Sequence, residues 1–241
     1  PKEIPAYVVN QVCGSGIRSV ASGFQSIKSG DSKIIIAGGQ ENMSLAPHAI
    51  HLRDGKKLGD AKIVDTMIKD GLWDVFNNYH MGITAENVAT KFQITRDEQD
   101  KFALSSQKKT LRAQKENRFN DEIISLKIKS TKAEIDFSKD EHPREGITLE
   151  SLKRLKPVFQ KDGTVTAGNA SGINDGAAAV TLMGDKEASQ RGLQKLVKIK
   201  SWASCGVDPA LMGTGPIPST KKALEIACLL YTSDAADDSL R

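Results

Sequence analysis

Hydrophobic positions in the first forty residues alternate between continuous runs and helical spacing. An apolar run at residues 6–9 predicts a short strand. Apolar side chains recur at helical spacing between Ile17 and Ile27, and Gly30 supplies a stop signal. A continuous apolar run at 34–37 predicts the next strand. Uninterrupted apolar strands that alternate with amphipathic helices indicate an α/β fold with a buried, largely parallel or mixed sheet.

The pattern then becomes irregular before helical signals return. Residues 40–82 are rich in His, Pro, Gly and Asn, which indicates an elaborate insertion with one short helix near 63–69. A helix is expected from Thr84, and a second begins at Thr95, where Thr95 and Glu98 have the spacing of a capping box.

The second half of the chain repeats the alternation of strands and helices. Residues 125–137 alternate like an edge strand or hairpin, and a short helix follows. After a glycine-rich run at 163–176, small apolar residues at 177–183 predict a strand. A last strand is expected at 197–203, before a helix that starts near Ser219.

Composition narrows the function classes. The 241 residues are 39% hydrophobic with a net charge of +4, which fits one or two globular domains at about 150 residues each. No apolar stretch approaches the roughly 18 residues of a membrane span, and no basic stripe is interleaved with aromatics, so neither membrane nor nucleic acid is an expected partner. Three cysteines without a CxxC pair indicate a reducing cytoplasm rather than disulfides or zinc.

Cys13 is the most informative position. It lies between the end of a predicted strand and the first turn of a predicted helix, beside Gly14 and Gly16. A helix N-terminus stabilises a thiolate, which is the nucleophilic form of cysteine, and the Cys13 amide is placed to donate to an oxyanion. The alternative is a buried structural cysteine, which is a common fate for this residue. The local pattern alone leaves both interpretations open.

Five segments together resemble the thiolase family, and within it the biosynthetic acetyl-CoA acetyltransferases. The resemblance runs in order from about residue 1 to about residue 227. The segments are CGSGIRS at 13–19, AGGQENMS at 37–44, YHMGITAE at 79–86, TVTAGNASGINDG at 164–176 and MGTGPIP at 212–218.

The resemblance implies an incomplete layered α/β/α core with an inserted CoA-binding loop domain. Residues 1–42 are expected to form part of the N-terminal core domain, and 43–173 the loop domain, which serves tetramer assembly and CoA binding. Residues 174–190 return a strand to the first core domain, and 191–227 begin the C-terminal core domain. Residues 228–241 have no thiolase counterpart and look like translated sequencing-adapter read-through, the alternative being a divergent natural C-terminus.

The implied reaction is a ping-pong Claisen condensation of two acetyl-CoA molecules to acetoacetyl-CoA and CoA, with thiolysis as its reverse. Cys13 matches the family's acylated nucleophile. A thioester carbonyl requires a soft nucleophile and a donor for its oxyanion, which agrees with the local pattern. The implied parent is a cytoplasmic homotetramer that takes CoA thioesters as substrates and needs neither a metal nor a covalently bound prosthetic group.

The family's CoA contacts transfer to seven further residues. Arg144 matches an arginine beside the nucleotide end of CoA, and Ser171 matches a serine that hydrogen-bonds the pantetheine. The remaining matches line the cleft, with the histidine at its inner end: Leu72, His80, Met81, Phe159 and Ala167. These residues also have structural interpretations. Arg144 fits an ordinary surface charge, and Ser171 fits a turn residue. Core positions fit Leu72, Phe159 and Ala167.

The sequence also departs from the family pattern. Neither the Gly-His-Pro motif, whose histidine activates the nucleophile, nor the Cys-x-Gly motif, whose cysteine handles the α-proton, occurs here. We therefore expect a fragment that is inactive or nearly so by itself. His48 and His51 lack a third ligand at a useful spacing for metal. Two alternatives stay open: a non-catalytic CoA-binding or assembly fragment, and a thiolase-fold condensing enzyme of different chain-length specificity.

Overall fold

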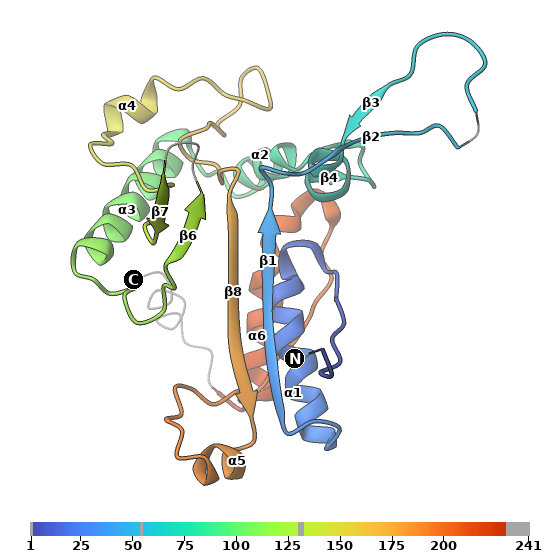
Figure 1. The fold of residues 1–241 in the computed structure, drawn as a ribbon. Helices are drawn as coiled ribbons and strands as arrows, with labels where there is room; N and C mark the ends of the chain where they lie inside the picture. Colours follow the sequence, from blue (N-terminus) through green and yellow to red (C-terminus); the bar gives the residue numbers. More distant parts are fainter. Residues whose placement is uncertain (1, 54, 130–132, 230–241) are drawn as a thin grey trace. The chain divides into compact units, whose positions relative to one another are not determined.

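The computed structural model describes residues 2–53, 55–129 and 133–229 (Figure 1). The predicted adapter tail therefore lies outside the described residues from residue 230 onward. The chain contains both helices and strands and divides into two compact units.

The second unit interrupts the first along the sequence. The first consists of residues up to 73 together with those from 173 onward, and the second is 74–172. The second unit thus falls inside the expected loop domain of 43–173, while 43–73 group with the first unit. The finer domain boundaries stay predictions.

The first unit is built around one long strand pair covered by a helix. β1 runs antiparallel to β8 over nine residue pairs, from Ile34 opposite Met183 to Asn42 opposite Asp175 (Figure 1). The elements of this unit are η1 (Val12–Gly14), α1 (Ser15–Ser29), β1 (Ile34–Asn42), β2 (His48–Ile50), β3 (Ile63–Asp65), η2 (Met67–Leu72), β8 (Asp175–Met183), α5 (Asp185–Gln190), η3 (Pro209–Thr214) and α6 (Pro216–Ile226).

Small residues let α1 lie close to the strand pair. Ala21 and Gly23 are the buried residues of α1, and a Cβ on Gly23 would stand 2.9 Å from Leu182 Cδ1 and 3.1 Å from Ile35 Cγ2. α1 ends as predicted at Gly30, whose φ of 86° is the left-handed conformation that glycine adopts without strain.

Two expected strands are wrong. Residues 6–9 and 197–203 form no strand, and within the described chain β1 pairs with β8 alone, antiparallel instead of in a parallel or mixed sheet. An apolar run becomes a strand only when a ladder partner lies beside it. Much of each run is instead exposed, with Val8 95% and Val197 87% accessible, while Val9, Ile199 and residues 201–203 are half-buried.

The helix expected at 63–69 begins later than predicted. Residues 63–65 form β3, which pairs antiparallel with β2, and the π-helix η2 follows over Met67–Leu72. The β-branched residues Ile63 and Val64 favour the extended conformation, so the helix starts after them.

The second unit is mainly helical, and its predicted elements are confirmed. Thr95 accepts from the Glu98 amide while the Glu98 carboxylate accepts from the Thr95 amide, which is the predicted capping box. The predicted hairpin and short helix are also present. The elements are β4 (Trp73–Asp74, at the start of this unit), β5 (Tyr79–His80), α2 (Met81–Lys91), α3 (Arg96–Lys115), β6 (Leu126–Lys129), β7 (Glu134–Phe137) and α4 (Leu149–Lys153).

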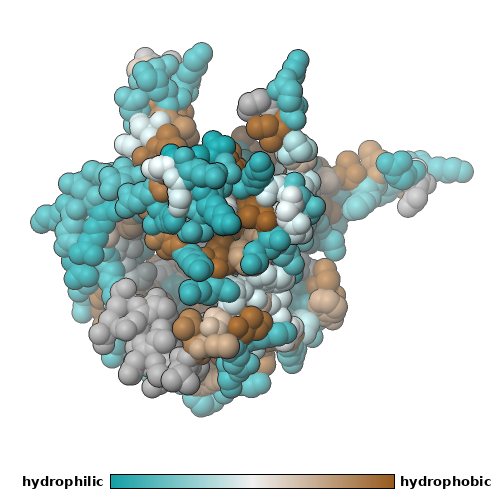
Figure 2. Space-filling view, turned by 90° about the horizontal axis from the view of Figure 1, so that it is seen from below, coloured by the Kyte–Doolittle hydropathy of each residue, from teal (hydrophilic) through white to brown (hydrophobic). Residues whose placement is uncertain are grey.

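Many large apolar side chains are exposed at the surface. Ile36 is 76% and Val180 50% accessible on the paired strands, and Leu58 is 93% accessible between β2 and β3. Figure 2 shows hydrophobic residues beside hydrophilic ones on one face. Within the described residues, none of the helices has the length and apolar character needed to cross a bilayer.

Candidate functional site

Cys13 lies exposed in a tight turn immediately before α1. Val12, the preceding residue, has a φ of 48°, a left-handed conformation that is strained for a β-branched side chain. The Val12 amide donates to Asn10 Oδ1 at 2.9 Å, and the Ser15 hydroxyl donates to the Val12 carbonyl at 2.7 Å. The turn is therefore held by its own neighbours in a conformation that presents the thiol at the start of a helix.

Arg18, one turn into α1, braces the same turn. Its Nε donates to Gln11 Oε1 at 2.9 Å, and its guanidinium lies 5.1 Å from the ring centroid of Trp202. Its Nη2 donates weakly to Ser204 Oγ at 3.4 Å. Arg18 thus contacts both the turn that carries Cys13, through Gln11, and the segment 202–204.

His80 and Phe159 come together in the second unit, and Met81 follows His80 as the first residue of α2. His80 is the N-cap of α2, and its Nδ1 accepts from the Gly82 amide at 2.9 Å. The His80 and Phe159 rings stack with centroids 4.7 Å apart. Partial burial lowers the pKa of His80 from its usual 6.5. The neutral imidazole therefore carries its proton on Nε2 and is a hydrogen-bond donor at that atom.

Segment 164–171, which carries Ala167 and Ser171, is tied to α2 and α3. The buried Glu86 carboxylate accepts from the amides of Thr164 and Val165, each at 2.8 Å to Oε1. Asn169 Nδ2 donates to Asp100 Oδ1 at 3.0 Å, so the segment has a contact on each helix.

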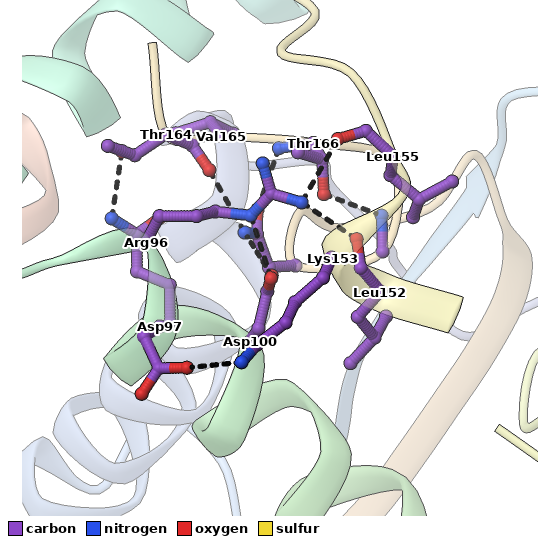
Figure 3. Close-up of polar contacts among 12 residues, drawn as sticks. Arg96, Asp97, Asp100, Leu152, Lys153, Leu155, Thr164, Val165 and Thr166 are labelled. Carbon is purple, nitrogen blue, oxygen red and sulfur yellow. Dashed lines mark hydrogen bonds and ion pairs between the residues drawn. The ribbon is translucent and has the colours of Figure 1, made fainter. Parts of the chain in front are cut away.

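Arg96 is the counter-charge of the buried Asp100 carboxylate. Its Nε lies 2.8 Å from Asp100 Oδ2, and its Nη2 donates to the carbonyls of Leu152 at 2.7 Å and Leu155 at 3.0 Å (Figure 3). Asp100 is fully buried. A buried charge is tolerated when it is paired and hydrogen-bonded, as it is here.

The remaining predicted contacts are separate features of the surface. Ala167 and Ser171 are exposed on their segment, and Leu72 is half-buried at the end of η2 in the first unit. Arg144 is exposed, and Gln107 of α3 accepts from its amide at 3.0 Å. Its guanidinium makes no ion pair with any described residue, which leaves the charge available to an anion.

The structure gives no metal-binding arrangement in its described ranges. No three His, Cys, Asp or Glu side chains gather there as ligands. His48 and His51 are exposed at β2, where His48 lies opposite Asp65.

Sequence analysis missed Glu86 and Asp100. A signal for Glu86 was present, because it shares a helical face with the buried Gly82 and Ala89, where a charge requires a partner. Asp100 stands four residues after Arg96, the spacing of a helical ion pair, but that spacing does not reveal burial.

Comparisons with known proteins agree on one family. The model of "Thiolase, N-terminal domain" matches residues 1–186. The acetyl-CoA acetyltransferase of Rhizobium meliloti is 60% identical over 227 residues, which are 94% of this chain and 58% of the relative, and that of Pseudomonas aeruginosa is 54% identical over 229 residues with the same coverage. The chain thus spans 58% of the length of these relatives.

Solved structures extend the agreement to the fold. The crystal structure of the Bacillus anthracis acetyl-CoA acetyltransferase is 43% identical with a TM-score of 0.91, over 95% of this chain and 58% of that one. That of human mitochondrial 3-ketoacyl-CoA thiolase in complex with CoA is 42% identical with a TM-score of 0.89, over 95% and 57%. The expected thiolase-like α/β fold is confirmed, and the chain belongs to the thiolase family.

Proposed function

We propose that this chain carries the nucleophile and CoA-binding part of an acetyl-CoA acetyltransferase. The observation that carries the proposal is the exposed Cys13 on a strained turn at the start of α1. Strained backbone that is over-determined by its surroundings clusters at functional sites. The 60% identity to an acetyl-CoA acetyltransferase supports the same assignment.

The first chemical step is transfer of the acetyl group to sulfur. The Cys13 thiolate attacks the thioester carbonyl of acetyl-CoA, a C–S bond to Cys13 forms and the C–S bond to CoA breaks. CoA leaves as a thiolate and takes up the proton that Cys13 has lost. Backbone amides at the start of α1 are suited to stabilise the tetrahedral oxyanion between these two events.

The second step forms a carbon–carbon bond. A base removes an α-proton from a second acetyl-CoA, and the carbanion attacks the acetyl-Cys13 carbonyl to give acetoacetyl-CoA and the Cys13 thiolate. The family assigns this proton transfer to the Cys-x-Gly motif, which this sequence lacks. We therefore propose that condensation requires the part of the enzyme that the relatives have beyond this chain.

CoA binding is proposed for the seven residues that the family resemblance matches to CoA contacts. His80 Nε2–H and the Ser171 hydroxyl supply donors, Met81, Phe159, Leu72 and Ala167 supply apolar contacts, and Arg144 supplies a cation for the nucleotide phosphates. The half-buried His80–Phe159 stack supports this role, because it offers an oriented donor beside an apolar surface.

Chain-length specificity separates this function from a second candidate. The likeness to human mitochondrial 3-ketoacyl-CoA thiolase, at a TM-score of 0.92, is the observation behind the second candidate, a condensing enzyme of different chain-length specificity. The higher identity to acetyl-CoA acetyltransferases, 60% against 42%, favours acetyl groups. A series of acyl-CoAs of increasing length distinguishes the two.

A chimera tests the activity. This chain replaces the matching 58% of the Rhizobium meliloti relative, and acetoacetyl-CoA thiolysis is measured with peptide mass mapping of acetyl-Cys13. We expect turnover and labelling of Cys13 in the chimera, neither in its Cys13→Ala variant, and no turnover by the 241-residue chain alone. CoA binding without acylation in the chimera that retains Cys13 would instead favour the non-catalytic binding fragment.

The proposal also covers the oligomeric state and the cellular compartment of the protein. We propose a homotetramer whose contacts involve the segment between β2 and β3, which exposes Leu52 and Leu58 at 53% and 93%. Analytical ultracentrifugation of the chimera with and without Leu58→Ser tests this assembly. The three unpaired cysteines are compatible with a reducing cytoplasm, and localisation of the tagged full-length protein tests the compartment.

A further inference from the structure

The segment that presents Ala167 and Ser171 has no regular secondary structure of its own. Its shape comes from polar contacts with helices more than sixty residues earlier in the chain. Gln99 Nε2 donates to Thr164 Oγ1 across a separation of 65 residues, and Thr164 contacts Glu86 across 78 (Figure 3 shows Thr164 to Thr166). The position of the two predicted CoA contacts therefore depends on side chains of α2 and α3 that are not themselves predicted CoA contacts.

Glu86 is the densest point of this network. Its Oε1 accepts from the Thr164 and Val165 amides at 2.8 Å, and its Oε2 accepts from the Thr164 hydroxyl at 2.8 Å. Glu86 is 5% exposed. Two consecutive amides and a hydroxyl that converge on one carboxylate fix the backbone direction at the start of the segment.

Gly163 makes room for this carboxylate. A Cβ at residue 163 would overlap Glu86 Oε1. The close approach of the chain to Glu86 thus requires glycine at this position.

Asn169 closes the segment on the other side. Its Oδ1 accepts from the Thr166 amide at 2.7 Å, and its Nδ2 donates to Asp100 Oδ1 at 3.0 Å and to the Thr164 carbonyl at 3.1 Å. Thr166 and Asp100 are both fully buried. The segment is consequently held at residues 164–165 and at Asn169, with the exposed Ala167 between these two points and Ser171 two residues after the second.

We propose that Glu86 is a positioning residue for CoA binding, acting through Thr164 and Val165 on the segment that carries Ala167 and Ser171. The inference rests on the proposed CoA contacts of those two residues. Glu86 itself touches no substrate. Its carboxylate sets the segment in its binding conformation before CoA arrives, which removes an ordering cost from association.

The test measures segment order and CoA affinity in the same 241-residue chain. Glu86→Ala removes every acceptor, Glu86→Gln keeps one oxygen for the two amides, and Gly163→Ala displaces the carboxylate without removing it. Phe137→Ala is the matched control, because it truncates a half-buried side chain of β7 in the same unit, outside α2, α3 and segment 164–171. Amide hydrogen exchange of 163–171 and calorimetric titration with CoA are the readouts.

We expect Glu86→Ala to speed exchange of the Thr164 and Val165 amides and to weaken CoA binding about tenfold, since two buried donors lose their acceptor. Gly163→Ala is expected to have the same two effects. Glu86→Gln is expected to weaken CoA binding about threefold at most, because the amides keep an acceptor. Phe137→Ala should leave CoA affinity within about twofold.

Three outcomes overturn the proposal. Unchanged exchange in both Glu86→Ala and Gly163→Ala removes the positioning effect, and faster exchange with unchanged CoA affinity makes the role purely structural. An equal loss of affinity in Phe137→Ala assigns the effect to general destabilisation. Ser171→Ala separates this failure from that of the proposed function: if Ser171→Ala binds CoA like the parent chain, or the parent shows no binding, the CoA contact itself is wrong and the inference falls with it.

Discussion

The imidazole of His80 lies face to face with the ring of Phe159, with centroids 4.7 Å apart and planes inclined by 18°. The same imidazole accepts from the Gly82 amide through Nδ1, so it caps α2 while it stacks. These two contacts fix both the plane of the ring and the atom that carries its proton. A donor with a defined direction is therefore built into the first turn of α2, at a residue that the sequence assigned to the CoA cleft.

Gly82→Ala is predicted to break this arrangement. A Cβ at residue 82 would overlap the Phe159 ring, so the ring must move and the stack with His80 is lost. Overpacking of this kind costs about 1–3 kcal/mol. Urea unfolding measures the loss, and CoA titration measures the effect on binding.

Gly206→Ala is the matched control for that substitution. A Cβ at residue 206 meets no atom within 4 Å, so its unfolding free energy should stay within about 0.5 kcal/mol of the parent. Equal effects of the two substitutions would contradict the overlap at Phe159.

Protonation of His80 is predicted to destabilise the fold. Burial lowers the pKa of His80 below its usual 6.5, so the unfolded chain binds this proton more readily than the folded chain. The contribution of His80 is therefore complete above pH 6.5 and is lost as the pH falls from 6.5 through the lowered folded pKa. Protonation of Nδ1 also removes the acceptor of the Gly82 amide.

Denaturant unfolding between pH 7.5 and 5 checks this dependence, because this window includes the ordinary histidine pKa of 6.5 and values below it. His80→Gln should flatten the curve in this window. His51→Gln, at an exposed position, should leave it unchanged. A wild-type curve that already matches His80→Gln would show that His80 does not titrate differently in the fold.

Local signals were readable from the sequence, and long-range ones were not. The Thr95 and Glu98 box and the Gly30 stop depend on neighbours within four residues, so their chemistry is visible in the letters. The Glu86 to Thr164 contact joins residues 78 apart, and no spacing rule reaches that far. The positive φ of Val12 was equally hidden, because valine is a residue that ordinarily avoids this conformation.

The candidate site divides in the same way. Motif resemblance singled out Cys13, His80 and Phe159, and the structure places the last two in contact. The motif resemblance does not reveal what holds these residues in place, since the supporting groups come from other elements. The apolar runs at 6–9 and 197–203 fail for a related reason: hydrophobic pattern states which residues prefer burial, and a ladder partner decides whether a strand forms.

Thr95→Ala is predicted to lower the unfolding free energy by about 1 kcal/mol, because α3 loses its N-cap hydroxyl. Thr95→Ser keeps the hydroxyl and should recover most of the loss. Bonds from Thr95 also hold the pKa of Glu98 below its usual 4.5, so the contribution of the box is present above pH 4.5 and is lost as the pH falls through the lowered folded value. Thermal unfolding at pH 7 and pH 3 measures both effects, and an unchanged stability in Thr95→Ala at pH 7 would contradict the assignment.

Val12→Gly is predicted to separate stability from reactivity at the Cys13 turn. The φ of 48° costs valine about 1–2 kcal/mol relative to an unstrained residue, and glycine adopts it freely but loses about 0.5–1 kcal/mol of chain entropy. Val12→Gly should therefore be as stable as the parent or up to about 1 kcal/mol more stable. The freed turn no longer holds the thiol in one direction, so acetylation of Cys13 in the chimera should slow by about tenfold. Val12→Asn, which tolerates this φ and keeps a side chain, should retain more of the rate, and peptide mapping distinguishes Cys13 from Cys205 and Cys228. A Val12→Gly chimera that acetylates Cys13 as fast as the parent would show that the strain at Val12 does not serve the nucleophile.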